Sequence, residues 1–144
     1  MYPHRLLTGN AYSTETGGTG WIVGYSPWTL LSGSGLLHVP TDQPLTGVCV
    51  KWFDHPAGHA SGPGKPVSVG RTLSILVCDD AVFRLQFSPI LEFLPEQTEE
   101  VVLRRPGDFA AWGPGLFHRW QAESRCTILT VRWQPGAEGE PFPR

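Results

Sequence analysis

The chain has 144 residues, of which 17 are glycine and 14 are proline, and its formal net charge at pH 7 is −2. Glycine and proline at this density leave few uninterrupted helical windows, so the composition excludes a long helical bundle. A hydrophobic content of 40% and six tryptophans supply enough apolar surface for one folded domain of short strands and tight turns. Because there is no net positive charge, we expect no nucleic-acid partner.

The N-terminal residues and the cysteine pattern favour a reducing cellular compartment. Residues 1–20 contain no apolar segment of the kind found in secretory signals, and no apolar run approaches the roughly 18 residues of a membrane span. The cysteines are odd in number, widely spaced and each beside apolar residues, at Cys49, Cys78 and Cys126. This pattern favours buried free thiols in a reducing compartment, so we expect a cytoplasmic protein without a membrane partner.

Taken in chain order, the sequence predicts an N-terminal arm (1–20), one β domain (21–135) and a Pro/Gly-rich tail (136–144). Segments rich in β-branched and aromatic residues, bounded by turn residues, predict short strands. They are residues 21–25, 35–39, 46–53, 71–77, 81–87, 99–105, 108–112, 117–121 and 126–133. The spacing around Cys78-Asp79-Asp80 predicts a hairpin between two of them, and residues 55–70 predict a long loop. This layout favours a small barrel or jelly roll.

The C-terminal third resembles the second motif of the cupin superfamily, which reads Gly, five residues, Pro-x-Gly, two residues, His. Gly107, Gly115 and His118 match that motif. Gly113 stands at the expected proline, with a proline one place later, and Ala122 stands at the expected asparagine. The glycines permit tight turns that would aim His118 into a barrel mouth.

Two further segments make the resemblance more specific. Small bacterial single-domain cupins of undefined activity, a group sometimes labelled signal peptidase I, carry K-W-x-x-H-x-A-G, T-L-S-I-L and W-G-P-G-x-x-H-x-W. Those patterns correspond here to residues 51–58, 72–76 and 112–120. The resemblance covers about residues 46–133. It implies an all-β, single-domain, cupin-type β-barrel, jelly-roll-like and built of two antiparallel sheets. It also implies a homodimer, for which the arm and residues 21–25 are the expected contact.

The resemblance identifies His118 as the position of one of four metal ligands in metal-binding cupins. The other three come from an earlier His-x-His and Glu; here Thr72 stands at the Glu position and no His-x-His precedes it. A transition metal needs three or four protein ligands, so we expect no cofactor. The alternative is a divalent transition metal in a non-standard site formed by His118, His55 and His59.

A ligand site is the other chemistry that these residues suggest. His118 and Trp120 are two apart on a predicted strand and therefore share a face. With His55 and Thr72 they are the candidate ligand-binding residues for an apolar or planar small molecule at the barrel mouth. The alternative is that His118 is a hydrogen-bonded core histidine and that Trp120 fills the core.

Three arginines lie on predicted strands, at Arg71, Arg84 and Arg132. An arginine that faces inward would bind a ligand carboxylate through two hydrogen bonds, whereas an outward salt bridge is the more ordinary role. No acidic pair suits acid–base catalysis, and no serine has an identifiable base, so the sequence assigns no catalytic residue.

Three functions therefore stand as hypotheses. The first is a small cupin protein with a barrel pocket for an unidentified small molecule and without the standard four-ligand metal site. The second is a metal-dependent enzyme of the isomerase or dioxygenase type that uses His118 with His55 and His59. The third is a non-catalytic homodimeric interaction module.

Overall fold

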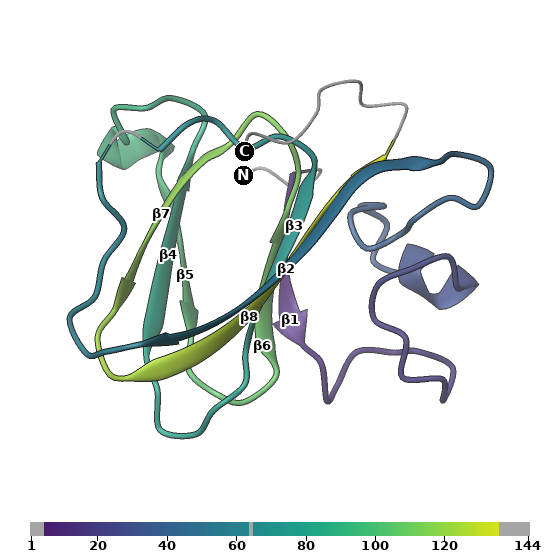
Figure 1. Cartoon of the computed structure of the whole chain (residues 1–144), viewed down its shortest axis with the longest axis horizontal. Coiled ribbons are helices and arrows are strands. Elements are labelled where there is room, and N and C mark those ends of the chain that lie inside the picture. Colours follow the sequence, from purple (N-terminus) through teal and green to yellow (C-terminus); the bar gives the residue numbers. More distant parts are fainter. Residues whose placement is uncertain (1–4, 64, 136–144) are drawn as a thin grey trace.

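Figure 1 shows the computed structural model, which describes residues 5–63 and 65–135. The predicted tail, residues 136–144, lies outside the described residues. The strands are β1 (Leu6–Asn10), β2 (Leu45–His55), β3 (Arg71–Leu76), β4 (Phe83–Ser88), β5 (Glu99–Leu103), β6 (Asp108–Trp112), β7 (Phe117–Ala122) and β8 (Cys126–Pro135). Two short 3-10 helices, η1 (Pro27–Leu30) and η2 (Pro95–Gln97), accompany them.

The strands form two antiparallel sheets that face each other (Figure 1). The five-stranded sheet has the order β1-β6-β3-β8-β2, and the three-stranded sheet has the order β5-β4-β7. The predicted all-β, jelly-roll-like fold of two antiparallel sheets is therefore confirmed. None of the described helices is long and apolar enough to cross a membrane.

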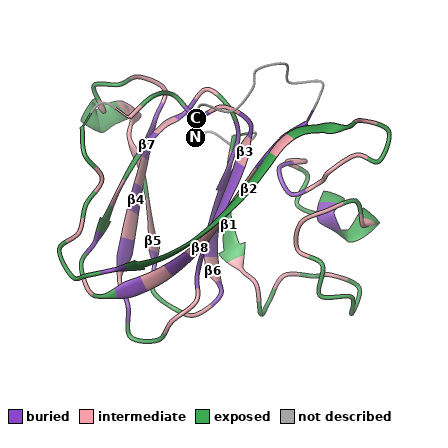
Figure 2. Cartoon of the chain, in the orientation of Figure 1, coloured by how far each residue is buried: buried purple, intermediate pink, exposed green. Residues whose placement is uncertain are grey.

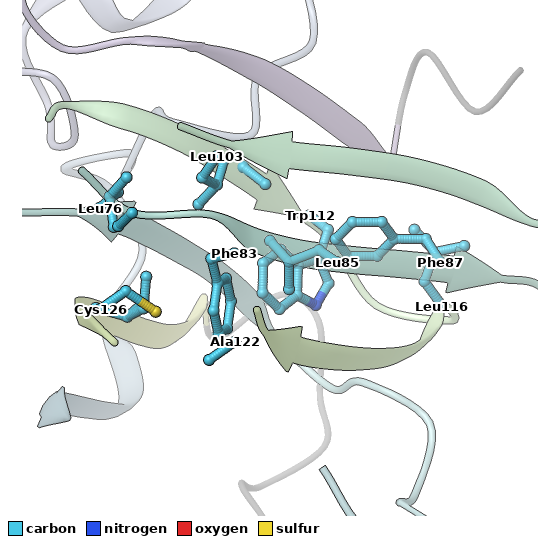
Figure 3. Packing of buried hydrophobic residues seen from close by; sticks show 12 residues of the cluster. Leu76, Phe83, Leu85, Phe87, Leu103, Trp112, Leu116, Ala122 and Cys126 are labelled. Atoms are coloured by element: carbon cyan, nitrogen blue, oxygen red, sulfur yellow. The ribbon is translucent and has the colours of Figure 1, made fainter. Parts of the chain in front are cut away.

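Alternation along the strands builds the core between the sheets. In β4, Phe83, Leu85 and Phe87 are buried, whereas Arg84 and Gln86 between them are only half-buried. This period of two places one apolar face against the other sheet. Figure 3 shows the resulting cluster, in which side chains of the three-stranded sheet pack against those of β3, β6 and β8.

A second apolar layer covers the outer face of the five-stranded sheet. Leu73, Phe109 and Trp133 are buried there beneath a segment that contributes Ile22 and Leu37. The predicted strands at 21–25 and 35–39 are wrong, because this segment forms only an isolated bridge between Gly24 and His38. The apolar residues of this segment are buried in an irregular layer rather than in strands. The φ of 140° at Gly24 favours glycine and departs from strand geometry.

The predicted hairpin across Cys78-Asp79-Asp80 is also wrong. β3 and β4 are not paired, because β3 belongs to the five-stranded sheet and β4 to the three-stranded one. Residues 77–82 carry the chain across the core from one sheet to the other. Each strand then turns its buried face toward the same interior, so the two strands pack face to face through side chains such as Leu76 and Phe83.

The polar arm contains a strand that its composition hides. β1 pairs with β6, with Leu6 opposite Trp112 and Asn10 opposite Asp108. Leu6 packs against the inner cluster and Leu7 against the outer one, so a two-residue apolar pattern is enough to hold this edge. The Asn10 side-chain amide donates to Asp108 Oδ1 at 2.8 Å.

The remaining predicted strands are confirmed with small shifts of their ends, and all three cysteines are free thiols. Cys126 is buried as expected, but the expectation of burial is wrong for Cys49, which is exposed on β2. β2 is an edge strand with a partner on one side only, so most of its residues are exposed (Figure 2).

We expect Leu76→Ala to lower the free energy of unfolding by about 2–5 kcal/mol, because Leu76 is fully buried between the sheets and its loss leaves a cavity. Chemical denaturation measures this change. The exposed Val50 on β2 is the control, and Val50→Ala should change stability by less than about 0.5 kcal/mol. Equal effects of the two substitutions would contradict the two-sheet core.

Candidate functional site

The interior between the sheets changes from polar to apolar along the ladder of β3 and β8. Each strand turns every second residue inward, and directly opposed residues share a face. The opposed inward pairs, in order, are Thr72 and Arg132, Ser74 and Thr130, and Leu76 and Ile128. The apolar end is the packed core, and the polar end surrounds a cavity of about 40 Å³.

This interior cavity brings together residues from both sheets and from the loop after β2. Its lining residues are Lys51, His55, Lys65, Thr72, Ser74, Phe83, Leu85, Trp112, His118, Trp120, Ile128, Thr130 and Arg132. The four candidate ligand-binding residues predicted from the sequence are all among them. The lining that the structure describes holds three cationic side chains and no carboxylate.

His118 is held in one orientation by hydrogen bonds at both ring nitrogens. It is buried on β7, with Ser68 Oγ 3.2 Å from Nδ1 and Lys65 Nζ 3.4 Å from Nε2. The Trp112 indole N–H also donates to Ser68 Oγ, at 3.1 Å. An ammonium group has only protons to give, so Nε2 accepts and the ring proton lies on Nδ1, which donates to Ser68 Oγ.

Burial is the main reason why His118 stays neutral. Burial, together with the positive charges of Lys65, Arg132 and Lys51, lowers the pKa of His118 to about 3. Burial also lowers the pKa of Lys65, with Lys51 and Arg132 adding to the effect. Neutral His118 therefore presents its Nε2 lone pair to the cation beside it.

His55 and His59 form a separate aromatic group beside Trp120. Their Nδ1 atoms are 2.9 Å apart, and the rings lie 4.5 Å and 5.0 Å from that of Trp120. The His55 ring also stacks on Phe53 at 4.3 Å. Burial, helped by the neighbouring His59, lowers the pKa of His55 to about 4.

The two lysines and Arg132 complete the polar end. Arg132 faces inward and donates from Nε to Thr72 Oγ1 at 3.0 Å. Lys65 lies within the loop, and the exposed Lys51 lines the same cavity from β2. Sequence reasoning missed both lysines. One signal was available, since these two are the only lysines in the chain.

Of the three strand arginines, only Arg132 faces the cavity. Arg84 points outward and forms ion pairs with Glu100 and Glu123. Arg71 donates to the backbone carbonyls of Gly35 and His38 in the covering segment. Arg84 therefore forms outward salt bridges, whereas Arg132 is placed where it could bind a ligand carboxylate.

The loop after β2 runs along the free edge of β7. Gly58 N donates to Ala122 O at 2.7 Å, and Ser68 N donates to Leu116 O at 2.9 Å, so the loop is fastened at both ends of the strand. A larger, open cavity of about 710 Å³ lies beside this loop. It shares Lys65, His118 and Trp120 with the interior cavity, so these three residues stand between the two spaces.

The described donor set does not fit a metal. Among residues 5–63 and 65–135, no three His, Cys, Asp or Glu side chains gather as a metal site requires. His55 and His59 bond to each other, whereas His118 Nε2 faces the ammonium of Lys65. A ligand triad of His118, His55 and His59 therefore does not form in this arrangement.

Comparison with known proteins finds similarity at the level of fold. No family model matches the chain, and no curated protein matches it. A cupin superfamily protein from Desulfitobacterium hafniense DCB-2 is 14% identical, with a TM-score of 0.45 over 67% of this chain and 72% of that one. The described part of the chain has two antiparallel sheets in a jelly-roll-like arrangement.

Two other solved structures match this chain over a smaller share of their own length. Streptomyces albus HEPD, with 2-hydroxyethylphosphonate and Fe(II) bound, is 17% identical with a TM-score of 0.49, over 62% of this chain and 19% of that one. The Mycobacterium tuberculosis rmlC epimerase is 17% identical with a TM-score of 0.44, over 66% of this chain and 47% of that one. This chain therefore spans about a fifth and about half of their respective lengths. Similarity at this level says nothing about ligand or activity.

We expect stability to fall as the pH is lowered from 6.5 toward 3. The unfolded chain protonates His118 near its usual pKa of 6.5, whereas the folded chain does so near 3, so the unfolded state binds more protons in between. The free energy of unfolding, measured by denaturant titration between pH 5 and 6, should lose about 1 kcal/mol per pH unit to this group. His118→Gln should remove that share of the slope.

Asp54 is the control for this pH dependence. Its hydrogen bond from Arg125 holds the pKa of that carboxyl below its usual value of 3.8, so it titrates below the tested range. Asp54→Asn should leave the slope between pH 5 and 6 unchanged. The same slope in wild type and in His118→Gln would contradict a buried, neutral His118.

Proposed function

We propose that this protein binds a small molecule in the polar end of the interior between its sheets. The observation that carries the proposal is the cavity beside His118, which breaks an otherwise apolar core with hydroxyls, a neutral imidazole and cations. Binding sites of this kind combine apolar walls with a few convergent polar groups. Trp120 and Phe83 supply the aromatic wall, with ring centres 5.6 Å apart.

The same geometry supports a pocket without the standard four-ligand metal site. His118 Nε2 already accepts from Lys65, and Thr72 Oγ1 already accepts from Arg132. Both positions that the family resemblance relates to metal ligands are thus engaged by cations. The proposal assigns no catalytic role to any residue. It places the protein in the cytoplasm, a reducing compartment, because the described chain keeps three free thiols.

A thermal-shift screen of small metabolites tests this function. Binding to the folded state raises the melting temperature, by several degrees when the ligand is at about 100 times its Kd. Compounds that shift wild type should lose that shift in His118→Ala and in Trp120→Ala, because both substitutions alter the cavity wall.

Trp52→Ala is the matched control, since Trp52 is 65% exposed on the outer side of the edge strand. It should keep every shift seen with wild type. If no compound in a broad screen shifts wild type, or if Trp52→Ala abolishes the shifts as completely as Trp120→Ala, the interior pocket is not the binding site.

A homodimeric interaction module is the second candidate function, and an exposed stripe on β2 favours it. Val48, Val50 and Trp52 are 58%, 64% and 65% exposed on the outward face of this edge strand. Exposed apolar residues on a long edge strand are a common site of strand-to-strand association. A second copy of the chain is the proposed occupant, in preference to a contact through the arm.

Light scattering at micromolar concentration measures this association. We expect a dimer for wild type and a monomer for Trp52→Glu, because a carboxylate in the stripe would be buried without a partner. Trp21→Glu is the control, since Trp21 is 66% exposed in the segment that the sequence favoured as the contact. A monomeric wild type, or a dimer disrupted only by Trp21→Glu, would reject the β2 surface.

A further inference from the structure

We infer that the interior cavity binds the carboxylate group of a small organic acid, held by Arg132, Lys65 and Lys51. This assignment rests on the proposed function, because it names the chemical class of the ligand that the pocket takes. It goes beyond a general small-molecule pocket, since a neutral ligand would leave the cations of the cavity uncompensated.

The first support is the charge of the cavity. Its lining contains Arg132, Lys65 and Lys51 but no Asp or Glu. No ion pair links any of the three to a carboxylate among the described residues. Lys65 and Arg132 are half-buried, and half-buried like charges that line one cavity raise the free energy of the folded state, a cost that a bound anion offsets.

The cations of the cavity differ from the arginines that form ion pairs elsewhere in the described chain. Two arginines outside the cavity do pair with carboxylates, Arg84 with Glu100 and Glu123, and Arg125 with Asp54, whereas the exposed Arg119 donates to the Gln86 side chain. The chain has an excess of acidic residues, 13 against 11 basic ones, so carboxylates are not scarce. Both lysines of the chain nevertheless line this one cavity, whose lining contains no Asp or Glu.

The second support is the direction of the donors. Arg132 donates from Nε to Thr72 Oγ1, and its two terminal nitrogens make no hydrogen bond within the described part of the chain. Lys65 Nζ uses one proton on His118 Nε2 and keeps two. An arginine end and a lysine ammonium that converge on one space form the usual pattern for recognising a carboxylate.

The third support is size. At about 40 Å³, the interior cavity holds roughly three water-sized groups, at 10–15 Å³ for each. A carboxylate has three heavy atoms, whereas a phosphate has five. The body of the acid would extend past Trp120 and Lys65 into the open cavity of about 710 Å³ beside the loop.

Acetate is the probe for the headgroup alone, with acetamide as its neutral isostere and inorganic phosphate as the rival anion. Each is titrated at pH 7 and constant ionic strength into the full chain, and the Trp112 indole N–H signal is followed by NMR. This N–H donates to Ser68 beside His118, so it reports on the cavity. Acetate should shift the signal saturably, acetamide should not, and phosphate should bind more weakly than acetate.

Arg132→Gln and Lys65→Gln should each weaken acetate binding about ten- to a hundredfold, the effect of losing a hydrogen bond to a charged group. Arg125→Gln is the control: it removes the same charge from an exposed ion pair with Asp54 and should leave binding unchanged. Equal loss in all three variants would mean general charge attraction and would overturn the assignment.

Wild-type protein provides a second measurement that does not depend on any variant folding. N-acetoxysuccinimide acetylates lysines, and peptide mapping reads Lys51 and Lys65 separately because they are the only two. Acetate should slow acetylation of Lys65, whereas acetamide should not. Equal protection by both, or tighter binding of phosphate than of acetate, would overturn the carboxylate assignment. Either result would leave intact a pocket already demonstrated by metabolite shifts that depend on Trp120.

Discussion

Ser68 is the residue on which the geometry of the candidate site depends. Its backbone is bonded twice to the segment before β7, donating to Leu116 O at 2.9 Å and accepting from Gly115 N at 3.0 Å. Its hydroxyl is the shared acceptor for Trp112 and His118. One buried serine thus accepts the imidazole proton that the Lys65 ammonium leaves on Nδ1, and it fastens the loop that carries Lys65.

The turn before β7 makes that fastening possible. Gly115 has a φ of 88°, a conformation in which a side chain would be strained, and a Cβ there would also lie 3.3 Å from the Arg5 guanidinium. The turn lets the chain reverse tightly enough for Gly115 N to reach Ser68 O. The glycines that the sequence motif emphasises therefore position the neighbouring loop as well as His118.

Local patterns predicted the parts of the fold that depend on local chemistry. The strand from Asp108 to Trp112, the glycine-rich turn and the inward pairing of His118 with Trp120 follow from period-two alternation and turn residues, and the structure has all three elements. The hairpin prediction was wrong because strand spacing does not show which sheet the second strand joins. The choice of sheet depends on contacts between distant residues, such as Phe83 with Trp120. β1 was missed because only Leu6 and Leu7 mark it, among polar neighbours.

The two lysines could not be placed from the sequence because neither belongs to a pattern. Lys65 lies in a loop rich in glycine and proline, and only the hydrogen bonds of Ser68 bring it to His118. Lys51 alternates with apolar residues on β2, and only the register with β8 shows that it shares the inward face of Thr130. Residue types indicated a pocket, but its charge depends on register and loop path.

The position of Lys65 changes what His118 can do. The lone pair of Nε2 accepts from an ammonium 3.4 Å away, and Thr72 Oγ1 accepts from Arg132 Nε. A divalent cation placed between these groups would meet repulsion from Lys65 and Arg132, with one imidazole to bind it. The same two charges attract an anion, and this electrostatic preference is the basis for the proposed carboxylate ligand.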